Sequence, residues 1–342
     1  MSQKTVRILS CDGGGLRGVF SAAVIKHMEE ATGRPAGKLF DAIIGTSTGS
    51  VLASMLAIRK PASDLMKLYQ EVGFKDLQHP TPEQRTDAFV NPLKKHLGES
   101  TTFGDIKDIK VCIPFRDTRS GEVSFASNFR SDRANWTDLP LWQAVRRSTA
   151  LPPLFTPVDD RYLDGGYSAF ANPSYEALRS AAELGWLVPG KPDALQIHSV
   201  GTTHHAPIAG KLGLAGGIDK YLKNPRNALT PAELLQLFVN DAMIQDVGFL
   251  QHQLLKAAQD RGELVYRRYN LKLEPSRLGS YEQKLQAAGI PVDTESLIKT
   301  YRIMDGATSM QYLATIGDIV AKEQFDVSQF PPEDAYPGQG GY

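Results

Sequence analysis

The sequence predicts an α/β fold with parallel strands, and two observations in the first 60 residues support this. Short apolar runs suited to buried strands occur at residues 6–10 and 40–44. Each run precedes a segment whose apolar residues have helical spacing, at 19–31 and 48–59. Strands that alternate with helices pair in parallel through crossover connections, so we expect an α/β core.

The rest of the chain continues the alternation. Further strands are expected at residues 109–115, 123–126 and 194–200. Further helices are expected at residues 141–147, 174–184, 231–258 and 309–324. The glycine-rich residues 209–224 are typical of a surface connection, with a lid or a lipid-contacting loop as the alternative. Residues 331–342 are typical of a flexible tail.

Composition excludes several classes of protein. The 342 residues carry 38 basic and 38 acidic side chains, so the net charge is zero, which argues against a DNA- or RNA-binding protein and against a basic membrane anchor. Two cysteines, Cys11 and Cys112, are too few for a disulfide framework. The N-terminus has no apolar signal core, and no run approaches the roughly 20 apolar residues that cross a bilayer. We therefore expect a soluble, cytoplasmic globular protein.

A serine motif lies between the second predicted strand and the helix that follows it. Gly45, Ser47 and Gly49 match the pattern Gly-x-Ser-x-Gly of a nucleophile elbow. In that turn a strained serine projects its hydroxyl, and small residues on either side let strand and helix approach closely. The same residues would also suit an ordinary helix start capped by Thr46 or Ser47, so both interpretations stand at this point.

A glycine loop follows the first predicted strand. Gly13, Gly15 and Gly18 fit the dinucleotide-binding pattern Gly-x-Gly-x-x-Gly. Asp12 argues against this, because it would place a carboxylate beside a diphosphate. Parallel strands bring this loop and the serine turn to the same sheet edge, where the loop N–H groups would suit an oxyanion hole. The oxyanion hole is the favoured interpretation.

The base that would activate the serine has several candidates. In the order Ser, acid, His, only the histidines from His198 to His252 qualify. His198 falls inside a predicted strand, whereas His204 and His205 follow it in a loop. Asp164, followed by two glycines, is the rival base, and Asp-Gly-Gly is also common in plain turns.

Taken together, three motifs resemble the patatin-like phospholipase family. They are the glycine loop 12–18, the serine turn 45–49 and the Asp-Gly-Gly at 164–166. The stretch 148–157, with its small residues, prolines and aromatic residue, resembles the family's segment before the Asp-Gly motif. Residues 199–203 resemble the end of the family's downstream strand. The resemblance covers residues 5–205, and Cys11 and Thr203 are its mild departures.

The resemblance implies a three-layer α/β/α sandwich with a mainly parallel central sheet. It also implies a Ser47–Asp164 dyad without histidine, and an oxyanion hole at Gly13, Gly14 and Gly15. No cofactor and no metal are expected. The supporting motif residues carried over are Asp12, Arg17, Gly18, Gly45, Gly49, Gly165 and Gly166.

The expected organisation is one catalytic domain over residues 1–330, with the core motifs in 5–205 and a helical C-terminal region in 206–330. The implied reaction is phospholipid acyl hydrolysis with peripheral contact at the inner membrane face, for which residues 212–218 offer an apolar surface. The alternatives are a Ser-His-Asp esterase and a non-catalytic dinucleotide-binding module.

Regulation is a further implication of the resemblance. Compact bacterial members of the family include anti-phage effectors that a cyclic dinucleotide activates, and this chain has a similar layout. Arg267, Arg268 and Tyr269 are a conceivable contact for such a nucleotide, with a strand-end charge cluster as the alternative. Assembly into a homo-oligomer is left open.

Overall fold

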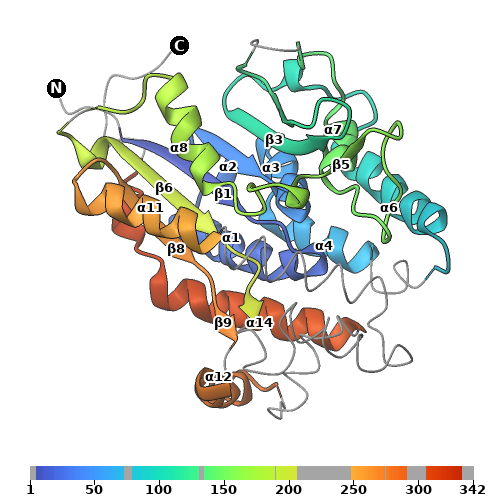
Figure 1. The fold of residues 1–342 in the computed structure, drawn as a ribbon. Coiled ribbons are helices and arrows are strands. Elements are labelled where there is room, and N and C mark those ends of the chain that lie inside the picture. The colour runs from blue at the N-terminus through green and yellow to red at the C-terminus, as the bar shows by residue number, and fades with distance from the viewer. Residues whose placement is uncertain are drawn as a thin grey trace, which may run out of the picture.

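The structure is a computed structural model that describes residues 5–72, 79–130, 135–188, 190–205, 248–273, 275–290 and 306–332 (Figure 1). Residues 209–224, most of the tail 331–342 and the first part of the helix predicted at 231–258 lie outside the described residues.

In the described part of the chain, seven strands form one sheet. Six follow the order β4-β3-β2-β1-β6-β8, and the seventh, β5, pairs with β3. The strands are β1 (Val6–Cys11), β2 (Ala42–Gly45), β3 (Lys110–Asp117), β4 (Val123–Ser127), β5 (Tyr162–Asp164), β6 (Leu195–Val200) and β8 (Val265–Tyr269). The pairs β1–β2, β1–β6, β2–β3 and β6–β8 are parallel, whereas β4 and β5 run antiparallel to β3. The short strands β7 (His204–His205) and β9 (Lys272–Leu273) pair separately.

Helices cover both faces of the sheet (Figure 1). The helices are α1 (Gly18–Thr32), α2 (Ala36–Leu39), α3 (Thr48–Ala57), α4 (Ala62–Glu71), α6 (Pro82–Leu97), α7 (Leu141–Ser148), α8 (Ser174–Glu183), α11 (Gly248–Asp260), α12 (Pro275–Ala287) and α14 (Gly306–Gln324). Leu9 and Cys11 of β1 belong to an apolar cluster with α1, α3 and α14, whereas Ile8 belongs to a second cluster with α8 and α11. Successive strand residues face opposite layers, so the predicted three-layer α/β/α sandwich is confirmed.

The sheet brings the predicted motifs to one edge. The glycine loop follows β1 and the serine turn follows β2, and these strands are parallel neighbours. Ile44 of β2 is level with Cys112 of β3, so Ser47 falls near the level of Phe115. Phe115 pairs with Asp164 of the antiparallel strand β5. The register therefore places Asp164 beside the serine turn.

Candidate active site

Ser47 occupies a strained position between β2 and α3. Its backbone angles are φ 54° and ψ −123°, and a positive φ is uncommon for a residue with a side chain. The Ser47 N–H donates to Ser148 Oγ at 2.9 Å, and Ser148 Oγ donates to the Pro114 carbonyl at 2.7 Å. These two bonds hold the strained turn from the neighbouring helix α7 and strand β3.

The two glycines of the serine motif are required by close backbone approach. A β carbon on Gly45 would lie 1.9 Å from the Gly49 carbonyl oxygen, and one on Gly49 would lie 2.1 Å from the Cys11 carbonyl oxygen. Both distances are far below any real contact, so side chains at these positions would separate β1, β2 and α3.

The Ser47 side chain contacts Asp164. Ser47 Oγ donates to Asp164 Oδ2 at 2.7 Å; Ser47 occupies the N-cap position of α3, but its side chain makes no capping bond to that helix. The other carboxylate oxygen of Asp164 accepts the Gly166 N–H at 2.6 Å. Gly165 and Gly166 form the tight turn after β5 that carries this acid.

Burial changes the acidity of Asp164. Its side chain is 2% exposed, and burial raises its pKa to about 7, although the hydrogen bonds from Ser47 and Gly166 work in the opposite direction. A carboxylate with this pKa is a far better proton acceptor at neutral pH than an exposed aspartate.

The glycine loop lies against the serine. A β carbon on Gly13 would be 3.2 Å from Ser47 Cβ. Among the three glycines, the Gly13 N–H already donates to the Ala171 carbonyl at 2.8 Å, whereas the Gly14 and Gly15 N–H groups donate to no carbonyl elsewhere in the described residues. Of the three glycines predicted for the oxyanion hole, Gly14 and Gly15 therefore remain available as donors.

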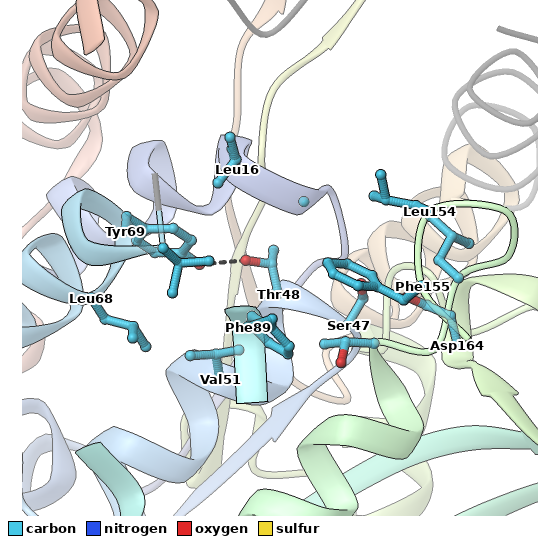
Figure 2. Close-up of a pocket in the computed structure, with 14 residues that line it drawn as sticks. Leu16, Ser47, Thr48, Val51, Leu68, Tyr69, Phe89, Leu154, Phe155 and Asp164 are labelled. Carbon is cyan, nitrogen blue, oxygen red and sulfur yellow. Dashed lines mark hydrogen bonds between the residues drawn. The ribbon is translucent and has the colours of Figure 1, made fainter. Parts of the chain in front are cut away.

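The supporting residues of the loop are directed into the protein. Arg17 is buried and its Nε donates to the Gly14 carbonyl at 3.2 Å. Gly18 begins α1, where it packs against the Tyr69 hydroxyl, which in turn hydrogen-bonds Thr48 Oγ1 (Figure 2). Asp12 is paired with Arg268 of β8 in a buried ion pair.

The histidine candidates for the base differ in their positions. His198 is fully buried in β6, bonded to the Tyr269 hydroxyl, and burial, aided by Arg7 and Arg267, lowers its pKa to about 3. The side chains of His204 and His205 lie outside the described residues. Within the described ranges, no three His, Cys, Asp or Glu side chains gather where they could hold a metal ion.

An apolar pocket opens beside the Ser47–Asp164 pair (Figure 2). Its empty space is about 650 Å³, part of it open to solvent. The polar lining residues are Ser47, Thr48, Thr149 and Asp164, and Gly15 also lines the pocket. The other lining residues are apolar or aromatic: Leu16, Val51, Leu68, Tyr69, Val72, Phe89, Leu151, Leu154 and Phe155.

Sequence reasoning missed several residues of this site. Ser148 lies in the 148–157 stretch that carries part of the family resemblance, so a signal for it existed. Tyr69 and Phe89 come from α4 and α6, which the apolar pattern did not indicate. These two residues line the pocket because of how the helices pack, and no local sequence motif marks them.

Comparison with known proteins identifies the family. A sequence profile described as patatin-like phospholipase matches residues 9–178, which contain the glycine loop, Ser47 and Asp164. A cGAMP-activated phospholipase from Pseudomonas aeruginosa is 31% identical over 239 residues, covering 64% of this chain and 68% of that protein. The chain belongs to the patatin-like phospholipase family. The resemblance stated from the three motifs is thereby confirmed.

Other relatives differ in the share of their length that this chain covers. A cGAMP-activated phospholipase from Vibrio cholerae is 29% identical over 253 residues, covering 62% of this chain and 70% of that protein. An intracellular phospholipase A2 from Caenorhabditis elegans is 33% identical over 167 residues, which cover 47% of this chain and only 16% of that protein. Among the helices that the structure describes, none combines the length and apolar character needed to span a bilayer.

Proposed function

We propose that this patatin-like chain is a serine acyl hydrolase that cleaves fatty-acyl esters of membrane phospholipids. One observation carries the proposal: Ser47 Oγ donates to a buried Asp164 carboxylate at 2.7 Å, and both side chains line an apolar pocket. A hydroxyl paired with a base of raised pKa is the arrangement that nucleophilic catalysis requires.

In the first step, Asp164 accepts the hydroxyl proton of Ser47 while Ser47 Oγ forms a bond to the ester carbonyl carbon. The carbonyl oxygen becomes an oxyanion, which the N–H groups of Gly14 and Gly15 stabilise together with the positive end of α3. The carbon–oxygen bond to the leaving alcohol then breaks, the alcohol takes the proton from Asp164, and an acyl-serine remains.

In the second step, water attacks the acyl carbon and Asp164 accepts its proton. A second oxyanion forms and collapses, the bond to Ser47 Oγ breaks, and that oxygen regains a proton from Asp164. The products are a free fatty acid and the starting enzyme. The same two groups therefore serve both halves of the reaction.

The pocket supports a lipid substrate. Its walls from α3, α4 and α6 are apolar, so an acyl chain that enters is removed from water at about 0.8 kcal/mol per buried CH₂ group. Phosphate is strongly hydrated, so the head group stays outside this pocket.

We extend the proposal to activation by a cyclic dinucleotide. Two bacterial relatives are named cGAMP-activated phospholipases, and the chain covers 68% and 70% of their lengths. The three-residue contact considered for Arg267, Arg268 and Tyr269 is not part of this proposal, because Arg268 and Tyr269 are engaged inside the protein. Titrating the purified chain with cyclic dinucleotides during hydrolysis tests this extension, and no stimulation by any of them contradicts it.

The test of the catalytic proposal is Ser47→Ala. We expect loss of hydrolysis of a short acyl ester and loss of labelling by a fluorophosphonate probe, with an unchanged thermal unfolding midpoint. His204→Ala/His205→Ala is the matched control and is expected to retain both signals. A Ser47→Ala chain that still hydrolyses the ester, or a control that loses activity to the same extent, contradicts the dyad.

A further inference from the structure

Asp12 is a buried carboxylate at the start of the glycine loop. Asp12 is 1% exposed, and its backbone N–H donates to the Val200 carbonyl at 3.0 Å. The next residue, Gly13, lies against Ser47. An uncompensated negative charge here would oppose the oxyanion that the loop receives, because like charges repel strongly away from water.

Arg268 compensates this charge from two strands away. Its Nη1 donates to Asp12 Oδ1 at 2.9 Å while its Nη2 donates to Asp12 Oδ2, so the guanidinium binds both carboxylate oxygens. The side chain crosses β6, which lies between β1 and β8. Ser199 of β6 pairs with Arg268 in the sheet, and its Oγ accepts a further bond from Arg268 Nη1 at 2.6 Å.

A buried polar network extends from this ion pair to the segment that holds the loop. Ser174 Oγ at the start of α8 donates to Asn172 Oδ1 at 2.6 Å and is hydrogen-bonded to Ser199 Oγ at 2.7 Å. Asn172 directly follows Ala171, whose carbonyl accepts the Gly13 N–H. Arg268 is therefore hydrogen-bonded directly to Asp12, which precedes Gly13. Through Ser199 and Ser174 it is also connected to Asn172, the neighbour of the residue that accepts the Gly13 N–H.

We propose that Arg268 is a positioning residue for acyl hydrolysis. By binding Asp12 it holds the glycine loop where Gly14 and Gly15 receive the oxyanion, and it cancels the carboxylate charge beside them. The inference rests on the proposed function, because it assigns Arg268 a part in the same reaction. Arg268 lies outside the residues 9–178 that the family profile matches, so the C-terminal part of the chain contributes to the site.

Burial acts on both partners of the pair. It raises the pKa of Asp12, and the charge and hydrogen bonds of Arg268, followed by the charge of Arg17, counteract that rise. Removing only the Arg268 guanidinium therefore leaves a desolvated carboxylate without the group that binds both of its oxygens, which is worse than removing both charges. This asymmetry gives the test a signature that a purely structural role does not produce.

The experiment measures kcat and KM for a short acyl ester, the rate of fluorophosphonate labelling and the thermal unfolding midpoint. The variants of the full chain are Arg268→Gln, Arg268→Lys and the double variant Asp12→Asn/Arg268→Gln. The matched control is Arg267→Gln, because Arg267 is the adjacent residue of β8 and faces the opposite layer, near His198.

We expect Arg268→Gln to lower kcat about 100-fold with little change in KM, since the loss falls on oxyanion stabilisation. Arg268→Lys restores part of that loss, because the charge returns without the two-pronged geometry. The double variant is expected to exceed Arg268→Gln in kcat about tenfold, because no unpaired charge remains. Arg267→Gln keeps the activity of the starting chain.

The outcomes separate this inference from the proposed function. An active starting chain with an equally active Arg268→Gln variant overturns the positioning role alone. A double variant whose thermal unfolding midpoint equals that of the starting chain, but whose kcat is no higher than that of Arg268→Gln, overturns the charge argument. A starting chain that, both alone and with added cyclic dinucleotides, neither hydrolyses esters nor is labelled by the fluorophosphonate at Ser47 overturns the proposed function, and with it the role of Arg268.

Discussion

Two buried aspartates flank the candidate nucleophile, and their surroundings differ. Asp12 and Asp164 are 1% and 2% exposed, so burial alone does not distinguish them. Asp12 is bound on both oxygens by Arg268. Asp164 accepts bonds only from the neutral donors Ser47 and Gly166 among the described residues.

The difference shows how one residue type supports two tasks in one site. A guanidinium on both oxygens makes the Asp12 carboxylate a fixed ion-pair partner. Without a cation, the desolvated Asp164 carboxylate has a pKa of about 7 and can take up and release a proton near neutral pH. The partner, and not the depth of burial, separates the structural acid from the candidate base.

Asp164→Asn is the most severe way to break the comparison. An amide cannot accept the Ser47 proton, so we expect kcat for a short acyl ester to fall about 10³-fold or more. The measurement is kcat of the purified variant, with circular dichroism to show that it is folded. Asp117→Asn is the matched control, because Asp117 is also buried but is bound by Arg161.

The control separates catalysis from stability. Asp117→Asn is expected to lower the unfolding midpoint, since it removes a carboxylate that holds Arg161, while the folded variant keeps its kcat. Equal losses of kcat in the two variants would show that Asp164 acts through the fold and not as a base.

The pH dependence of the reaction sharpens the same contrast. The base must be deprotonated, and burial raises the pKa of Asp164 to about 7, so kcat/KM is expected to rise with pH and level off above that value. Below it, kcat/KM should fall about tenfold per pH unit. The measurement is kcat/KM against pH in buffers of constant ionic strength. A profile that stays flat from about pH 5 to 8 contradicts an Asp164 base.

Ser148→Ala gives the smallest expected effect and tests the alignment of Ser47 with Asp164. The change leaves the Ser47 N–H and the Pro114 carbonyl without their partner, at about 1–3 kcal/mol for each buried group. We expect kcat to fall about tenfold, because the strained turn is held less firmly. Ser54→Ala is the control: Ser54 is buried in α3 and its hydroxyl has no hydrogen-bond partner among the described residues. A kcat as high for Ser148→Ala as for that control would argue that Ser148 does not align the nucleophile.

Local patterns predicted the elements that meet at the site. The strands at β1, β2, β3 and β6 and the helices α1, α3, α7, α8 and α14 occur where apolar spacing placed them, within a few residues. Near the site, α4, α6, β5 and β8 were not indicated, and elsewhere in the described residues neither were α2, α12, β7 and β9. β5 has only three residues, and β8 contains two adjacent arginines that obscure its alternation.

The sequence by itself determined the strand–turn–helix units and the two glycine motifs. Gly45 and Gly49 are required by contacts within their own turn and with the neighbouring strand, so the steric need leaves a short, readable pattern. Only the tertiary structure decided which acid meets Ser47, which loop N–H groups remain available and where Arg268 binds. These depend on sheet register and burial, which join residues more than 100 positions apart, and a pKa follows from that assembled environment.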